Sequence, residues 1–152
     1  EKILIIDLDV HQGNGTAEIF GGDDSVFTFS MHGEKNYPFK KEKSDVDIGL
    51  ANETKDEEYL KILKETLPQL IEEVKPDFVF YLSGVDVLET DQLGKLSLSI
   101  KACKERDRFV LQSLKDKNLP VECSMGGGYS KEIKHIVEAH ANTYRLAQEI
   151  FY

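Results

Sequence analysis

The stretch that decides the fold is IIDLDVHQGNGT, residues 5–16, in which a short apolar run turns abruptly polar. Asp7, Asp9 and His11 follow one another at every second position, and glycines come directly after them. In extended backbone, residues two positions apart point to the same side, so these three side chains share one face. Two carboxylates and an imidazole at the end of a strand suit a metal site, a phosphate-handling site or simply the cap of a turn.

Length and composition limit the class of protein. A chain of 152 residues has the length of a single domain and is long enough to form a hydrophobic core. The formal net charge of -9 argues against nucleic acid as a partner, because phosphate binding needs a basic surface. Neither a membrane-spanning run nor a leader pattern is present, and Cys103 and Cys123 lack metal or disulfide spacing. We therefore expect a cytoplasmic domain that contacts no membrane.

Short apolar runs alternate along the chain with amphipathic segments. We expect strands at residues 2–7, 25–32, 78–83 and 120–125, helices at 56–74, 99–116 and 130–151, and a helical turn at 15–20. A polar, lysine-rich loop is expected between 33 and 54, and Pro68 is expected to bend the first long helix. This alternation predicts an α/β domain, with a parallel sheet and helices on both faces.

Polar residues follow each expected strand. They are Asp7, Asp9 and His11 after the first, Ser30 and His32 after the second, Asp86 and Asp91 after the third, and Tyr129 after the fourth. In parallel sheets, ligands bind at the carboxyl ends of the strands, which lie at one edge of the sheet. The sequence therefore predicts a single site to which all four strand ends contribute.

A metal site is the hypothesis that uses most of these residues. Asp9 and His11 can bind one ion, and Asp86 can complete a set that leaves a position open, as catalytic zinc requires. The glycines at 126–128 let backbone approach a ligand closely and bring Tyr129 to the rim. The Tyr129 phenol can then donate a hydrogen bond to a developing oxyanion. By itself, however, a glycine triplet is equally typical of a helix N-terminal turn or a phosphate cradle.

Two alternatives stay open at this point. Asp7-x-Asp9 resembles the first motif of the haloacid-dehalogenase superfamily of magnesium-dependent phosphatases, with Asp7 as nucleophile and Asp9 as general acid. The strand ending at Ser83 would supply the second motif, but this hypothesis leaves His11 and Tyr129 without a role. The other alternative is a non-catalytic scaffold that binds acyl-lysine.

Several other residues have simpler structural explanations. Asn14 lies between two glycines, which is typical of a turn, because asparagine tolerates left-handed backbone. His135 and His140 fall in the last expected helix, where we expect packing or solvent contact. Cys123 lies inside an expected strand, and we expect it to be a small core residue.

Taken together, the motifs resemble the histone deacetylase superfamily and its arginase/deacetylase-type three-layer fold. The motifs are DLDVHQGNGT (7–16), SMH (30–32), NYPF (36–39), SGVDVLETDQLGKLSLS (83–99) and MGGGYS (125–130). They occur in family order along the whole chain. HQGNGT and the LGKLSLS run resemble the class IV branch and its bacterial relatives in particular.

The resemblance implies a hydrolase that removes acyl groups from lysine or from a small acylated amine. On it, Asp9, His11 and Asp86 match the zinc ligands, and Tyr129 matches the tyrosine that stabilises the transition state. Tyr37, Leu93, Gly127 and Gly128 match substrate-binding positions.

The resemblance also implies a second cation site, for potassium or sodium, formed by Asp7, Asp9, His11, Ser30 and Met31. Asp7 has a further expected role, which is to orient a catalytic histidine.

One part of the family pattern is missing from residues 1–152. The general base of the family comes from a histidine pair upstream of the Asp-x-His strand, and this chain holds neither histidine. The resemblance therefore implies the C-terminal half of a single deacetylase domain, which alone is expected to be inactive or nearly so. We also expect self-association through an exposed sheet edge at Lys2–Asp7.

Overall fold

A parallel sheet of five strands, in the order β3-β2-β1-β4-β5, forms the centre of the molecule. The computed structural model describes residues 1–152. Its strands are β1 (Ile3–Asp7), β2 (Val26–Gly33), β3 (Val46–Leu50), β4 (Phe78–Gly84) and β5 (Val121–Gly126), and its helices are α1 (Asn14–Phe20), α2 (Asp56–Val74), α3 (Ile100–Asp116) and α4 (Ile133–Phe151). The expected strands and helices are confirmed, with boundaries that differ by three residues or fewer.

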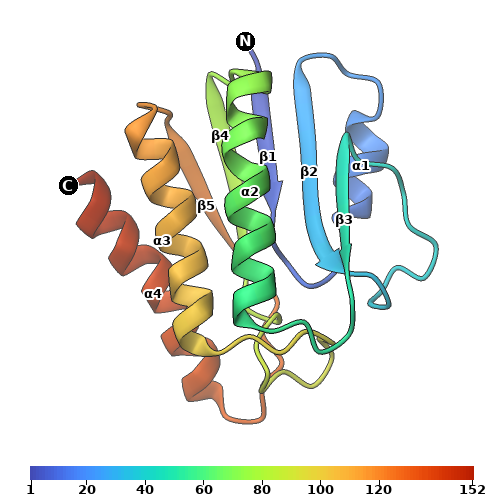
Figure 1. Ribbon diagram of the computed structural model, residues 1–152, viewed down its shortest axis with the longest axis vertical. Coiled ribbons are helices and arrows are strands. Elements are labelled where there is room, and N and C mark those ends of the chain that lie inside the picture. Colours follow the sequence, from blue (N-terminus) through green and yellow to red (C-terminus); the bar gives the residue numbers. More distant parts are fainter.

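The crossovers place helices on both faces of the sheet, as the sequence predicted. The chain steps one way from β1 through α1 to β2, and the opposite way through α2 and α3. Because such crossovers are right-handed, α1 lies on the face opposite to α2 and α3. Figure 1 shows α2 and α3 in front of the sheet and α1 behind it, with α4 packed beside α3. The direction reverses between β1 and β4, and this switch point is where α/β sheets bind ligands.

The segment from 33 to 54, expected to be a loop throughout, contains β3. This strand is short, lies at the edge, pairs only with β2, and alternates half-buried with exposed residues. The sequence did not predict this strand because it contains Asp47 and Gly49, two residue types depleted in strands, and follows a lysine-rich segment. The Gln12 amide helps to fix the segment by donating to the Asp47 carboxylate at 2.8 Å and to the Glu42 carbonyl at 2.7 Å.

The exposed edge expected at Lys2–Asp7 is not there. β1 is the central strand, pairing with β2 on one side and with β4 on the other, and Leu4 and Ile6 are completely buried. The prediction failed because it placed the first strand of the sequence at the outside, whereas the crossovers carry the chain to both sides of it. The open edge next to β4 belongs to β5.

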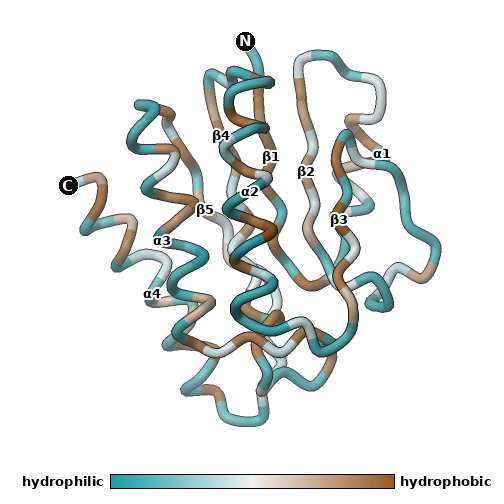
Figure 2. The backbone as a smooth tube through the Cα atoms, viewed as in Figure 1, coloured by the Kyte–Doolittle hydropathy of each residue, from teal (hydrophilic) through white to brown (hydrophobic).

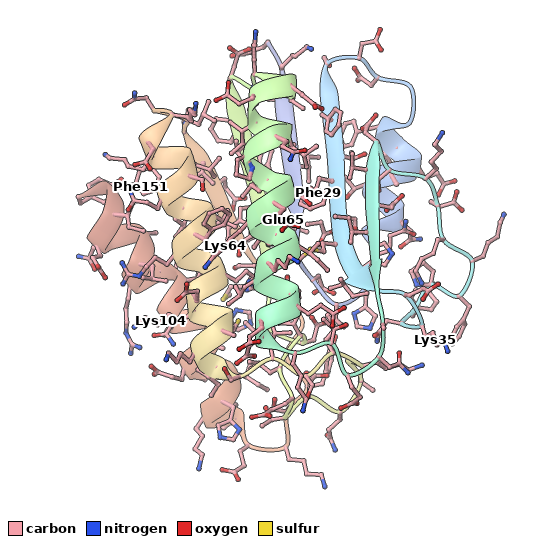
Figure 3. The ribbon with its side chains drawn as sticks, in the orientation of Figure 1. Phe29, Lys35, Lys64, Glu65, Lys104 and Phe151 are labelled. Atoms are coloured by element: carbon pink, nitrogen blue, oxygen red, sulfur yellow. The ribbon has the colours of Figure 1, made fainter.

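The core lies between the sheet and its helices. Figure 2 shows hydrophobic residues along the strands and hydrophilic residues along most of the β2–β3 connection. Phe29 of β2 is buried beside α2, while Lys64 and Glu65 project from the outer side of that helix (Figure 3). Lys64 pairs with Glu105 of α3 at 2.9 Å. α2 runs without interruption through Pro68, where the expected bend stays a prediction. None of the helices has the length and apolar character needed to cross a bilayer.

Candidate metal centre

The turn after β1 is built by its own carboxylates. The Asp9 N–H donates to Asp7 Oδ1 at 3.0 Å, and the His11 N–H donates to Asp9 Oδ1 at 2.8 Å. These two bonds between residues two apart satisfy backbone donors at the point where the strand stops pairing. They also place the Asp9 and His11 side chains on the side of β4, at the switch point.

Asp9, His11 and Asp86, the three expected metal ligands, converge at this point. His11 Nδ1 lies 3.0 Å from Asp9 Oδ1 and 3.1 Å from Asp86 Oδ2, and one donor atom of each residue lies within 4.8 Å of the others. The Val10 N–H donates to Asp86 Oδ1 at 2.9 Å, which orients the second oxygen of that carboxylate toward His11. Asp86 is completely buried, whereas Asp9 and His11 are partly open to solvent.

The charges of the cluster favour a cation at its centre. Hydrogen bonds to Asp86 and Asp9 raise the pKa of His11 to about 10. Burial acts to raise the pKa of Asp9, but the hydrogen bonds from His11 outweigh it, so that pKa is lowered overall. Burial also raises the pKa of Asp86. An imidazolium between two carboxylates therefore balances the cluster when no divalent ion does so.

Glycines lie against the Asp9 and Asp86 carboxylates. A Cβ on Gly84 would lie 2.7 Å from Asp9 Oδ2, and one on Gly127 would overlap the Asp86 carboxylate. Side chains at these positions would therefore displace the donor atoms. The donor set itself, two carboxylates and an imidazole, suits zinc better than magnesium, which prefers oxygen ligands alone. Both observations fit a transition-metal site.

Asp7 and Ser30, expected in a second cation site, lie opposite each other in the pairing of β1 and β2. Both are buried, and burial raises the pKa of Asp7 to about 7. The Ser30 hydroxyl is hydrogen-bonded to His32 Nδ1 at 2.9 Å, and Met31 is completely buried. The structure thus brings Asp7 and Ser30 together, and the monovalent-cation site stays a prediction.

Tyr129 is held through its backbone. Its N–H donates to Asp91 Oδ2 at 2.7 Å, and Asp91 Oδ1 accepts from the N–H groups of Leu93 and Gly94 at 2.9 and 2.8 Å. Gly128, directly before Tyr129, has a φ of 109°, which side-chain-bearing residues rarely adopt. The Tyr129 side chain is half-exposed, at 49 %. Sequence reasoning gave Asp91 no such role, although an aspartate three residues before a glycine is a turn pattern.

Tyr37 and Leu93, the expected substrate-binding residues, are exposed and belong to neighbouring loops. The buried Asn36 joins those loops, because its Nδ2 donates to the Leu93 carbonyl at 3.0 Å and its Oδ1 accepts from the Lys95 N–H at 3.1 Å. The Tyr37 ring also contacts Phe39 edge to face, with centroids 6.3 Å apart. An asparagine in a polar loop carries no sequence signal for this bridging role.

Comparison with known proteins matches this fold and site to one family. The family model of the histone deacetylase domain matches residues 1–144. An uncharacterized protein of Picosynechococcus sp. is 47 % identical over 99 % of this chain and 50 % of its own length. Histone deacetylase 2 of Arabidopsis thaliana is 33 % identical over 90 % of this chain and 36 % of its own length. The crystal structure of acetylpolyamine aminohydrolase from Burkholderia pseudomallei shares the fold, with a TM-score of 0.82, 17 % identity, and coverage of 98 % of this chain and 45 % of that one.

The site is thus a candidate metal centre at the switch point of an arginase/deacetylase-type sheet. The chain belongs to the histone deacetylase family. It spans half or less of the length of the curated relatives it matches. The phosphatase hypothesis finds no support, because Asp7, its nucleophile, is buried and only 4 % exposed.

Proposed function

We propose that this chain carries the metal centre of a zinc-dependent deacetylase, which hydrolyses the amide bond of acyl-lysine or of a related acylated amine. The observation that carries the proposal is the convergence of Asp9, His11 and Asp86 at the switch point, in a chain of the deacetylase family. No other group of three or more acidic, histidine or cysteine side chains converges in this way.

Each residue of the site then has a chemical role. Asp9, His11 and Asp86 would hold the zinc, which would supply Lewis-acid polarisation of the acyl carbonyl and of the attacking water. Tyr129 donates its phenolic hydrogen to the carbonyl oxygen as that oxygen gains negative charge. The hydrogen bond from the Tyr129 N–H to Asp91 fixes the backbone from which the ring projects.

The exposed residues of the two joined loops bind the substrate in this proposal. Tyr37 and Leu93 contact the acyl-bearing side chain, and Gly127 and Gly128 let backbone lie close to it. Asp7 and Ser30, paired across β1 and β2, would contribute to a site for potassium or sodium. A cation there would keep the Asp7 carboxylate ionised despite its burial.

We further propose that residues 1–152 are the C-terminal half of one deacetylase domain, and that the general base comes from the other half. The length of the matched relatives supports this. So does Asp7, whose side chain accepts one hydrogen bond, from the Asp9 N–H, and orients no histidine of this chain. His32 is bonded to Ser30, which leaves no free histidine beside Asp7.

The open side of the sheet is where we propose that the other half docks. β5 has no partner on its outer edge, and Met125 on that strand is 64 % exposed. Beside it, Ile133, Val137 and Tyr144 recur at helical spacing and form an exposed apolar face on α4. A groove of about 510 Å³ lies between β5 and the end of α4. Exposed apolar surface of this kind marks an interface.

Hydrolysis of an acetyl-lysine peptide tests the function. We expect turnover by the full-length protein, loss of turnover after removal of metal with a chelator, recovery on addition of zinc, and next to none from residues 1–152 alone. The variant Asp86→Asn should abolish activity, while Asp23→Asn, on the exposed α1–β2 turn, should not. Activity that survives metal removal would overturn the zinc proposal. Robust turnover by residues 1–152, free of contaminating enzyme, would overturn the half-domain proposal.

A further inference from the structure

Two adjacent charged residues lie inside the molecule on α3. Arg106 and Asp107 are both 0 % exposed, on the buried side of a helix that packs against the sheet. Burying charge is costly unless each group is paired and hydrogen-bonded. The hydrogen-bond partners of Arg106 and Asp107 therefore decide what role the buried pair can have.

Asp107 anchors the pair to the surrounding elements. Arg106 Nε donates to Asp107 Oδ1 at 2.8 Å, and Arg106 Nη2 lies 2.8 Å from the same oxygen. Asp107 Oδ1 also accepts from the Tyr81 hydroxyl on β4 at 2.6 Å, and Oδ2 accepts from the Thr143 hydroxyl on α4 at 2.7 Å. The guanidinium is thus held in one orientation from α3, β4 and α4.

The remaining nitrogen of Arg106 points at the two strand ends that carry the metal ligands. Nη1 donates to the Leu8 carbonyl at 3.2 Å and to the Gly84 carbonyl at 2.6 Å. Leu8 directly precedes Asp9, and Gly84 lies two residues before Asp86. The ladder between β1 and β4 ends with the bond from the Leu8 N–H to the Leu82 carbonyl at 3.1 Å. Beyond this point Arg106 joins the two backbones.

We propose that Arg106, oriented by Asp107, is a positioning residue that sets the separation of Asp9 and Asp86 at the metal centre. The inference rests on the proposed function, which supplies the metal. Arg106 does not touch the metal or the substrate. It acts through the Leu8 and Gly84 carbonyls, which fix where the two ligand-bearing segments leave the sheet.

The geometry calls for arginine rather than for any cation. The planar guanidinium contacts Asp107 through Nε and Nη2, and its Nη1 donates to the Leu8 and Gly84 carbonyls. A lysine ammonium at the same position is a compact donor that cannot span these acceptors together. Arg106→Lys thus keeps a positive charge beside Asp107 and removes the bridge between the strand ends.

The test compares metal binding with stability in the full-length protein. The variants are Arg106→Lys, the double variant Arg106→Met with Asp107→Asn, and the control Leu114→Ala. Leu114 is equally buried and lies two turns further along α3, outside the network. Zinc affinity is measured by competition with a chromophoric chelator, the coordination geometry from the visible spectrum of the cobalt-loaded protein, and stability from urea unfolding.

We expect both Arg106 variants to bind zinc about 10- to 100-fold more weakly, the range found when groups that orient metal ligands are removed. Their cobalt spectra should also change. Leu114→Ala should unfold at lower urea but keep the zinc affinity and the cobalt spectrum. If Arg106→Lys does not fold, the double variant, which buries no unpaired charge, carries the comparison.

Zinc affinity and cobalt spectra equal to those of Leu114→Ala in both Arg106 variants would overturn the inference and leave the proposed function standing. Failure of the unsubstituted protein to bind zinc would overturn the proposed function itself, and the inference with it. The two failures are therefore distinguished in one experiment.

Discussion

The two sides of the sheet differ in how completely they are covered. On the closed side, β3, β2 and β1 with α1 and α2, the last four residues of β1 and the last six of β2 are buried, whereas β5 has no buried residue. On the open side, β5 and α4, Met125, Ile133 and Val137 are between 59 % and 73 % exposed. Because exposed apolar surface of this kind is typical of an interface, this difference supports the proposal that another segment covers the open side.

Because of this difference in coverage, we expect metal binding and catalysis to depend on different parts of the molecule. The proposed metal ligands follow β1 and β4, two strands paired on both sides, and local hydrogen bonds hold them in place. Tyr129 follows β5, the edge strand on the open side, and is half-exposed. We therefore expect the metal centre to form within this chain, and catalysis to depend on what covers the open side.

The largest expected effect is a loss of catalysis without a loss of metal binding. Tyr129→Phe in the full-length protein removes the hydroxyl that stabilises the oxyanion, and should lower kcat about 10²- to 10³-fold. Its zinc content should stay unchanged, because Tyr129 is not a ligand. Steady-state kinetics and metal analysis check both values. The matched control is Tyr144→Phe, whose hydroxyl bonds the Cys123 carbonyl at 3.2 Å on the same side. Equal losses of activity in the two variants would contradict the role of Tyr129.

A pair of substitutions tests whether the closed side carries the stability. Leu63→Ala removes a completely buried side chain of α2, and should lower the free energy of unfolding by about 2–5 kcal/mol. Val137→Ala on the exposed face of α4 should change it by less than about 0.5 kcal/mol in residues 1–152 alone, at a concentration where the chain is monomeric. Urea denaturation measures both. A large loss from Val137→Ala would show that its face is already packed in the isolated chain.

Self-association tests the open side directly. Residues 1–152 alone should associate through β5 and α4, and Val137→Lys should weaken the association about tenfold, which corresponds to ~1.4 kcal/mol. The control is Ile19→Lys, which changes an equally apolar, exposed residue of α1 on the closed side. Light scattering across a concentration series gives the values. A monomer at all concentrations would count against the docking surface.

The smallest expected effect is a pH dependence of the reactivity of Cys123, which lies on the edge strand β5. Burial, and then the charge of Glu122, raise the pKa of Cys123 from its usual 9.0 to about 11. A thiol reacts as its thiolate, so alkylation of Cys123 should be slow at pH 8 and rise until the pH nears 11. The folded state favours the neutral thiol, so this group's contribution to stability is lost between pH 9 and 11. Mass spectrometry of alkylated protein follows the rate. A plateau at pH 9 would contradict the raised pKa.

The sequence predicted the convergence of Asp9, His11 and Asp86 because each lies at the carboxyl end of a parallel strand. Asp9 and His11 are two residues apart just after one strand, and Asp86 lies two residues after its neighbour in the sheet. Parallel pairing then brings the three together without any detail of packing. The helices and four of the strands were predicted because each follows from the spacing of its own apolar residues.

What the sequence did not predict depends on contacts between distant segments. β3 is stabilised by pairing with β2 rather than by its own residues, and the position of β1 in the sheet depends on all the crossovers. The bridging role of Asn36 joins residues 57 positions apart. Arg106 did leave a signal, because it and Asp107 lie at helical spacing between Cys103 and Val110, on the apolar stripe of α3.

The most direct test of the account is the metal content of the chain. Purified protein is offered equimolar zinc and magnesium and analysed by elemental mass spectrometry, together with Asp86→Asn and the surface control Asp23→Asn. Asparagine keeps an oxygen for the Val10 N–H and loses the charge that the metal needs. We predict about one zinc per chain, lost in Asp86→Asn and kept in Asp23→Asn. Magnesium in place of zinc, or zinc that persists in Asp86→Asn, would contradict the assignment of Asp9, His11 and Asp86 as a zinc centre.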